Sequence, residues 1–157
     1  MSMKTVYIET RVVSYVVARP SPHPLTLSRQ RTCRIWWEHR RPWCACYISE
    51  LVVDEASDGD AEMARLRLDA LTGIERLPIT NESTELAVAF LATGALPSGA
   101  SDDAVHLAVA TCARLDFLVT CDTRHLANPH ILPRLRREAK ARGWELPEVC
   151  SPEQLIG

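Results

Sequence analysis

The sequence lacks any long hydrophobic run. No apolar stretch approaches the roughly 18 to 20 residues that a membrane-spanning helix needs. The apolar segment at residues 6–8 is too short for the hydrophobic region of a signal peptide, and no small-residue cleavage site follows it. We therefore expect no membrane association and a cytoplasmic location.

Cysteines at metal-binding spacing are also missing. The six cysteines include no Cys-x-x-Cys pair, and most lie in apolar stretches, so we interpret them as small buried hydrophobic residues. A zinc site would need closely paired ligands. A disulfide framework is not expected in a cytosolic chain of 157 residues.

The chain has no strong charge of one sign. Its formal net charge of -2 argues against a protein that coats nucleic acid without specificity. Arginine and lysine nevertheless gather in two segments, at residues 29–41 and 134–142. Each segment is either a solvated helix face or a surface that faces a phosphate backbone, and the sequence leaves both interpretations open.

The sequence does contain short apolar runs that alternate with helical patterns. We predict strands at residues 6–8, 43–48, 74–79 and 117–120. We predict helices at residues 10–18, 25–39, 49–55, 60–71, from 80 or 81 onward, 102–113 and 131–142, with Ser49, Asp60, Ser101 and Ser151 among the capping residues. Strands separated by helices favour a parallel sheet covered on both faces. The predicted fold is one three-layer α/β/α domain over residues 1–157, with a central, mainly parallel sheet.

Carboxylates follow several of these predicted strands. Glu9 directly follows the first strand, Asp122 lies two residues after the last, and Glu55 comes one short helix after the second. Asp102 and Asp103 begin the helix after the glycine-containing loop. Because ligands bind beyond the carboxyl ends of the strands in an open parallel sheet, we expect these acids to converge at one edge.

Each acid also has a purely structural interpretation. Asp102 and Asp103 could complement a helix N-terminus, Asp122 could cap a short turn, and Glu55 could be solvated. Glu9 is harder to explain, because a carboxylate at the end of an apolar strand is costly unless it is paired or binds a metal.

A cluster of carboxylates needs a cation, because like charges raise one another's pKa. Oxygen ligands suit Mg²⁺ or Mn²⁺. Such an ion can activate water and stabilise an in-line phosphoryl displacement. The pattern therefore points to metal-assisted phosphodiester hydrolysis.

Four segments resemble the PIN-domain family, in its order and over nearly the whole chain. They are Val-Tyr-Ile-Glu-Thr at residues 6–10, Ile-Ser-Glu-Leu-Val-Val-Asp-Glu at 48–55, Asp-Asp-Ala-Val-His-Leu-Ala-Val-Ala at 102–110, and Leu-Val-Thr-Cys-Asp-Thr-Arg-His-Leu-Ala-Asn at 118–128. The third segment, with the strand that follows it, is the most specific. The most similar branch is that of VapC-type toxins. The resemblance implies a Mg²⁺- or Mn²⁺-dependent endoribonuclease that cleaves RNA, forms a homodimer and is inhibited by a small antitoxin protein.

The resemblance assigns catalysis and metal binding to Glu9, Glu55, Asp103 and Asp122. Thr10 and Thr120 would be neighbouring hydroxyls. Glu50 and Asp102 are near-duplicates of two of the acids, so the choice among them rests on the alignment of short motifs. His106, one helical turn after Asp103, is interpreted as a packed or supporting residue rather than a ligand.

Two residues depart from the family pattern. Glu9 is longer by one methylene than the more usual aspartate, which moves its carboxylate by roughly 1 Å. Arg11 stands where the family usually has a small hydroxyl residue, and its guanidinium could pair with an acid or bind a substrate phosphate. These departures favour the main alternative, a weakened PIN-like module that binds RNA, metal or a protein partner without cleavage.

Other functions with acidic pockets fit less well. A phospho-accepting receiver needs a lysine near a late strand, but the only lysines are Lys4 and Lys140. A haloacid-dehalogenase-type phosphatase needs Asp-x-Asp after its first strand, and residues 9–11 lack it. If an antitoxin binds, Trp36 and Trp37 are candidate anchors for its apolar helix, unless they pack in the core.

Overall fold

A five-stranded, entirely parallel sheet lies at the centre of the computed structural model, which describes residues 2–156. Its strands are β1 (Thr5–Ile8), β2 (Ala45–Ser49), β3 (Glu75–Leu77), β4 (Phe117–Val119) and β5 (Glu148–Cys150), in the order β3-β2-β1-β4-β5. In the central register, Tyr7 of β1 lies beside Tyr47 of β2 and Leu118 of β4. The order of the strands makes β1 the middle of the sheet.

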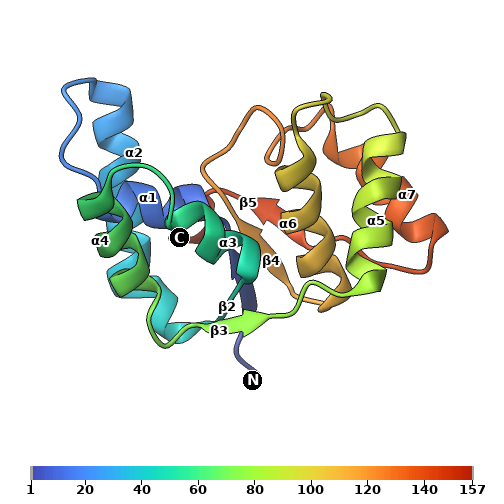
Figure 1. Cartoon of the computed structure of the whole chain (residues 1–157), viewed down its shortest axis with the longest axis horizontal. Helices are drawn as coiled ribbons and strands as arrows, with labels where there is room; N and C mark the ends of the chain where they lie inside the picture. The colour runs from blue at the N-terminus through green and yellow to red at the C-terminus, as the bar shows by residue number, and fades with distance from the viewer. Residues whose placement is uncertain (1, 157) are drawn as a thin grey trace.

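Helices cover both faces of this sheet. They are α1 (Thr10–Val17), α2 (Pro24–Ile35), α3 (Glu50–Ala56), α4 (Ala61–Leu71), α5 (Asn81–Ala92), α6 (Ser101–Cys112) and α7 (Leu132–Ala141). Figure 1 shows α1, α2 and α4 on one side and α5, α6 and α7 on the other, with α3 in contact with α1, α4 and α6. The predicted three-layer α/β/α fold with a central, mainly parallel sheet is confirmed. None of the described helices is long and apolar enough to cross a membrane.

The central strand is apolar from Val6 to Ile8 because helices pack on both of its faces. Val6, Tyr7 and Ile8 are all buried, as a strand in a doubly covered parallel sheet must be. On one side the core continues into α1 through Val12 and Val13, which are also buried. This packing fixes the carboxyl end of β1, where the next residue along the chain is an acid.

Most predicted elements exist, with local corrections. Asp60 caps α4 by accepting from Met63 N–H at 3.0 Å, and Thr80 caps α5. The prediction that Ser101 caps α6 is wrong, because Ser101 is already helical and Ala100 takes the cap position. Strand β5 was not predicted.

The predicted second helix ends earlier than expected. The α-helical geometry stops at Ile35, and a π-helical turn (Trp36–Arg40) and a 3₁₀ turn (Arg41–Trp43) follow it. As a result β2 begins at Ala45 rather than at Trp43, whose side chain is exposed.

The tryptophans of the π-helical turn lie in the core. Trp36 is fully buried and Trp37 nearly so, and their rings meet edge to face with centroids 6.4 Å apart. The guanidinium of Arg41 covers the ring of Trp37 at 4.5 Å. Of the two interpretations that the sequence left open for this pair, packing in the core is the one found, so neither ring is exposed to anchor a partner.

All six cysteines are free thiols; Cys33 and Cys150 are buried and the others half-buried. In the first basic segment, Arg34 donates to the carbonyl oxygens of Val16 and Ala18 and so closes the end of α1. In the second segment, α7 buries Leu135 and exposes its basic residues.

Candidate functional site

The backbone places Glu9 where β1 ends and α1 begins. Its N–H donates to the carbonyl of Val119 in β4 at 3.1 Å, which extends the sheet by one residue. Glu9 is also the N-cap of α1, so its carboxylate turns back over the first turn of the helix and accepts from Arg11 N–H at 3.2 Å. The positive end of the helix dipole favours a carboxylate there. The hydroxyl of Thr120 donates to Glu9 Oε1 at 2.7 Å.

Glu9 is almost fully buried, and burial raises the pKa of its carboxyl. His106, the Thr120 hydroxyl and Arg11 act in the opposite direction but do not outweigh burial. An acid in this environment gains from any additional cation that approaches it.

Asp103 and Asp122 form a second part of the site, together with His125. Asp103 Oδ2 lies 2.9 Å from His125 Nδ1, and Asp122 Oδ1 accepts from the backbone N–H groups of Arg124 and His125 at 2.9 and 3.2 Å. The other carboxylate oxygen of Asp122, Oδ2, is buried and accepts no hydrogen bond from the described residues. The turn after β4 therefore holds Asp122 by one oxygen and leaves the other without a hydrogen-bond donor in the described part of the chain, so that a cation can approach it.

Glu55 approaches the site from the last turn of α3. Its Oε1 accepts from the Thr10 hydroxyl at 2.6 Å and lies 2.6 Å from His106 Nε2. Burial opposes ionisation, but the bonds from His106 and Thr10 outweigh it and lower the pKa of Glu55. This carboxylate is therefore held ionised at neutral pH.

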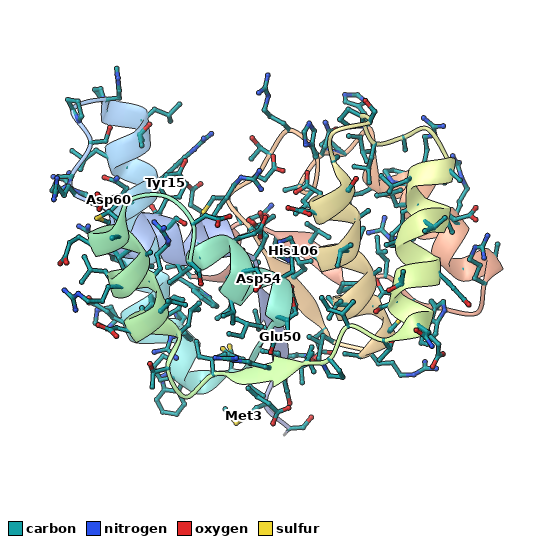
Figure 2. All side chains as sticks on the ribbon, viewed as in Figure 1. Met3, Tyr15, Glu50, Asp54, Asp60 and His106 are labelled. Carbon is teal, nitrogen blue, oxygen red and sulfur yellow. The ribbon has the colours of Figure 1, made fainter. Side chains whose placement is uncertain are left out.

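A buried hydrogen-bonded chain orients His106. The Tyr7 hydroxyl lies 2.7 Å from His106 Nδ1 and 2.8 Å from Ser49 Oγ. An ionised Glu55 can only accept, so His106 Nε2–H donates to it, and Nδ1 is the ring nitrogen that bonds with the Tyr7 hydroxyl. Figure 2 shows His106 between α3 and α6. His106 thus supports Glu55, as the sequence suggested.

Arg11 lies between the acids of the two parts. Its Nη1 atom is 3.4 Å from Glu9 Oε2, 3.6 Å from Asp103 Oδ1 and 3.4 Å from Asp122 Oδ2. Burial lowers the pKa of Arg11, but these three carboxylates outweigh it and raise the pKa. Of the two roles that the sequence left open, the structure has Arg11 paired with acids.

Of the two near-duplicate acids, the structure separates Glu50 from the cluster and keeps Asp102 beside Glu55. Glu50 is exposed, lies at the start of α3 (Figure 2) and pairs with Arg76 at 3.5 Å, away from Glu55. Asp102 is more exposed than Asp103, and burial followed by the neighbouring Glu55 carboxylate raises its pKa.

The donor atoms fall into two groups, in each of which they lie within 4.8 Å of one another. The groups are Glu9, Glu55 and His106, and Asp103, Asp122 and His125. Their oxygen-rich composition suits a hard divalent ion, and Asp122 Oδ2, which accepts no hydrogen bond from the described residues, is the kind of buried acceptor that a cation satisfies. The residues present therefore fit such an ion.

Sequence reasoning missed three members of this arrangement. Tyr7 and Ser49 were assigned only to structural positions, and His125 was given no role. The available signals were the place of His125 in the family-like segment 118–128 and its spacing three residues after Asp122, and neither indicated that its imidazole meets Asp103.

Comparison with known proteins supports the fold. No family model and no curated protein matches the sequence. Among solved structures, a chain of VapBC2 from Rickettsia felis, crystallised with a DNA fragment from its promoter, is similar with a TM-score of 0.53 and 17% identity. The match covers 81% of this chain and 95% of that chain. At this identity the likeness establishes a shared fold.

Proposed function

We propose that this protein is a divalent-metal-dependent endoribonuclease, and that it acts as the toxin of a toxin–antitoxin pair. The observation that carries the proposal is the meeting of Glu9, Glu55, Asp103 and Asp122 from four distant segments, with Asp122 Oδ2 buried and lacking a donor. Structural likeness to a VapBC2 chain and the PIN-type sequence motifs support the same conclusion.

In this proposal Glu9, Glu55, Asp103 and Asp122 hold Mg²⁺ or Mn²⁺. When bound, the ion supplies an activated water and neutralises charge on the phosphate oxygens. The chain's own residues prepare the site. Thr120 fixes one oxygen of Glu9, the backbone after β4 fixes one oxygen of Asp122, and His106 and Thr10 keep Glu55 ionised and oriented.

The partners in this proposal are an RNA substrate, a small antitoxin and a second copy of the chain. VapBC2 is a two-component assembly, and the likeness to one of its chains is the reason for proposing an antitoxin partner. The homodimer is tested by sedimentation at micromolar concentration. A dimer with twice the 17.5 kDa mass of the chain is expected. A single species with the mass of one chain would exclude a stable homodimer.

The activity is tested on a mixed pool of structured and single-stranded RNA with Mn²⁺, Mg²⁺ or EDTA. α3 provides a matched pair of variants, Glu55→Gln in the cluster and Glu50→Gln on the exposed surface of the same helix. Loss of a residue that only supports a metal ligand already lowers metal affinity or activity by about 10- to 100-fold. Glu55→Gln changes a proposed ligand itself and is therefore expected to lower cleavage by about 100-fold or more. Glu50→Gln should cleave as the wild type does. Equal cleavage by both variants would refute the assignment of Glu55.

A second candidate function is a module that binds without cleavage. The three contacts of Arg11 Nη1 with the acids favour it, because a resident guanidinium opposes a metal ion in the same place. Metal-dependent cleavage in the assay above would exclude this candidate.

A further inference from the structure

Arg11 reaches the acid cluster from the first turn of α1, and a single atom of its guanidinium meets three carboxylates. Those carboxylates come from the end of β1, the start of α6 and the turn after β4. Their side chains are 2%, 8% and 5% exposed, whereas the side chain of Arg11 is 50% exposed. The tip of Arg11 is therefore inserted among buried acids while the rest of the side chain remains at the surface.

The contacts are those of a counter-charge rather than of a tight structural bridge. Bidentate arginine–carboxylate pairs usually have N–O distances of about 2.7–2.9 Å, whereas the three distances here are 3.4 to 3.6 Å. Asp122 Oδ2 remains without a hydrogen bond although Nη1 is near it. One positive charge is thus shared by three carboxylates, and none of them lies at the usual distance of a charged hydrogen bond from it.

We propose that the Arg11 guanidinium is a built-in counter-cation that occupies the space between Glu9, Asp103 and Asp122 and competes there with a divalent metal ion. The inference rests on the proposed function. Because half of the Arg11 side chain is exposed, the guanidinium can move into solvent while α1 stays in place. Metal binding is then an exchange of one cation for another, and the metal-free protein stays folded because its acids are already compensated.

Removal of Arg11 should therefore strengthen metal binding. An opposite charge at this range shifts the proton affinity of a carboxylate by about one to three pK units, and a divalent ion carries twice the charge of a proton. We expect Arg11→Ser to bind Mn²⁺ about tenfold more tightly than the wild type, or more. Arg11→Lys, which keeps the charge, should bind close to the wild type.

The matched control is Arg31→Ser. Arg31 is exposed on α2 and makes no ion pair among residues 2–156, so the variant changes the net charge equally and leaves the cluster intact. Its Mn²⁺ affinity should equal that of the wild type. Arg11→Gln is a second neutral variant, which keeps a polar side chain near the acids and decides the question if Arg11→Ser does not fold.

The measurements are the dissociation constant of Mn²⁺ and the thermal midpoint in EDTA and in excess Mn²⁺. Arg11→Ser or Arg11→Gln should lose stability in EDTA and regain more with Mn²⁺ than the wild type, because ligand stabilisation grows with affinity. Equal or weaker Mn²⁺ binding by the neutral variants, beside binding by the wild type, would overturn the inference and leave the proposed metal site standing. Failure of all variants and the wild type to bind millimolar Mn²⁺ would overturn both.

Discussion

Tyr7→Phe tests the buried chain that supports Glu55. Tyr7 is fully buried, and its hydroxyl bonds to Ser49 at 2.8 Å and to His106 at 2.7 Å. Burial raises the pKa of this phenol, so it remains a protonated donor at all pH values of interest. Phenylalanine preserves the ring and its packing and removes only the hydroxyl.

The expected cost follows from what the hydroxyl leaves behind. Each buried hydrogen bond contributes about 0.5–1.5 kcal/mol, and a buried group left without a partner costs about 1–3 kcal/mol. Ser49 and His106 are both buried, so we expect a loss of about 2–3 kcal/mol in the free energy of unfolding. With an m-value of about 2 kcal/mol/M, the urea midpoint should fall by roughly 1 M.

The assay is equilibrium unfolding in urea, followed by tryptophan fluorescence. Tyr15→Phe is the control, because the hydroxyl of Tyr15, in the second turn of α1, makes no hydrogen bond within the described residues. It should change the free energy by less than about 0.5 kcal/mol. The reasoning is refuted if both variants shift the midpoint equally at an unchanged m-value. Metal affinity should also fall about 10-fold in Tyr7→Phe, because His106 loses the bond that orients it towards Glu55.

Three further predictions concern the rest of the fold. Asp116 accepts from Thr5 N–H and from the Thr5 hydroxyl, and these bonds lower the pKa of its carboxyl. The ionised carboxylate therefore stabilises the folded protein fully above the unfolded-state pKa of about 3.9, and this contribution is lost as the pH falls through the folded-state pKa. The difference between the urea midpoints of wild type and Asp116→Asn should therefore be larger at pH 6 than at pH 2.5, and a constant difference would contradict this. Trp36→Ala, which empties the largest fully buried side-chain site, should cost about 3–5 kcal/mol in urea unfolding, and a cost below about 1 kcal/mol would contradict its place in the core. Cys33 Sγ and Cys121 Sγ are 3.2 Å apart beside a cavity of about 190 Å³. A small-molecule disulfide should therefore oxidise the pair to a disulfide by thiol exchange. The reaction should be slow, because the hydrogen bond with Cys33 and burial raise the pKa of Cys121. Mass spectrometry should then find two thiols fewer, and a full thiol count after long incubation would refute it.

The sequence allowed most of the fold to be predicted because its strong signals are local. The strands β1 and β4 are short apolar runs, and α6 is apolar on nearly every side, as an element buried between others must be. Strand β5 escaped prediction because its three residues, Glu148–Cys150, carry no hydrophobic pattern of their own and become a strand only by pairing with β4.

The sequence indicated which acids approach one edge of the sheet, but not the hydrogen bonds and ion pairs that connect them or the other side chains that join them. Glu9 and Asp122 could be placed at one sheet edge because each follows a strand in a parallel sheet. The division of the donors into two groups depends on side-chain distances of a few ångströms between residues far apart in the chain. The same holds for the pairing of Arg11 with the acids and for the link from Tyr7 to Glu55 through His106. A tyrosine within an apolar strand indicates only a core position, so the sequence did not predict the hydrogen bond between the Tyr7 hydroxyl and His106.

The most direct test of the account is the cleavage of end-labelled RNA by wild type and Asp103→Asn in Mn²⁺, side by side. Asp103 is buried and contacts both His125 and Arg11, and asparagine nearly keeps its shape while removing its charge. The account predicts defined cleavage products from the wild type in Mn²⁺ and none in EDTA. It predicts that the folded variant gives less product than the wild type by about 100-fold or more. Equal cleavage by Asp103→Asn, or undiminished cleavage in EDTA, would contradict it.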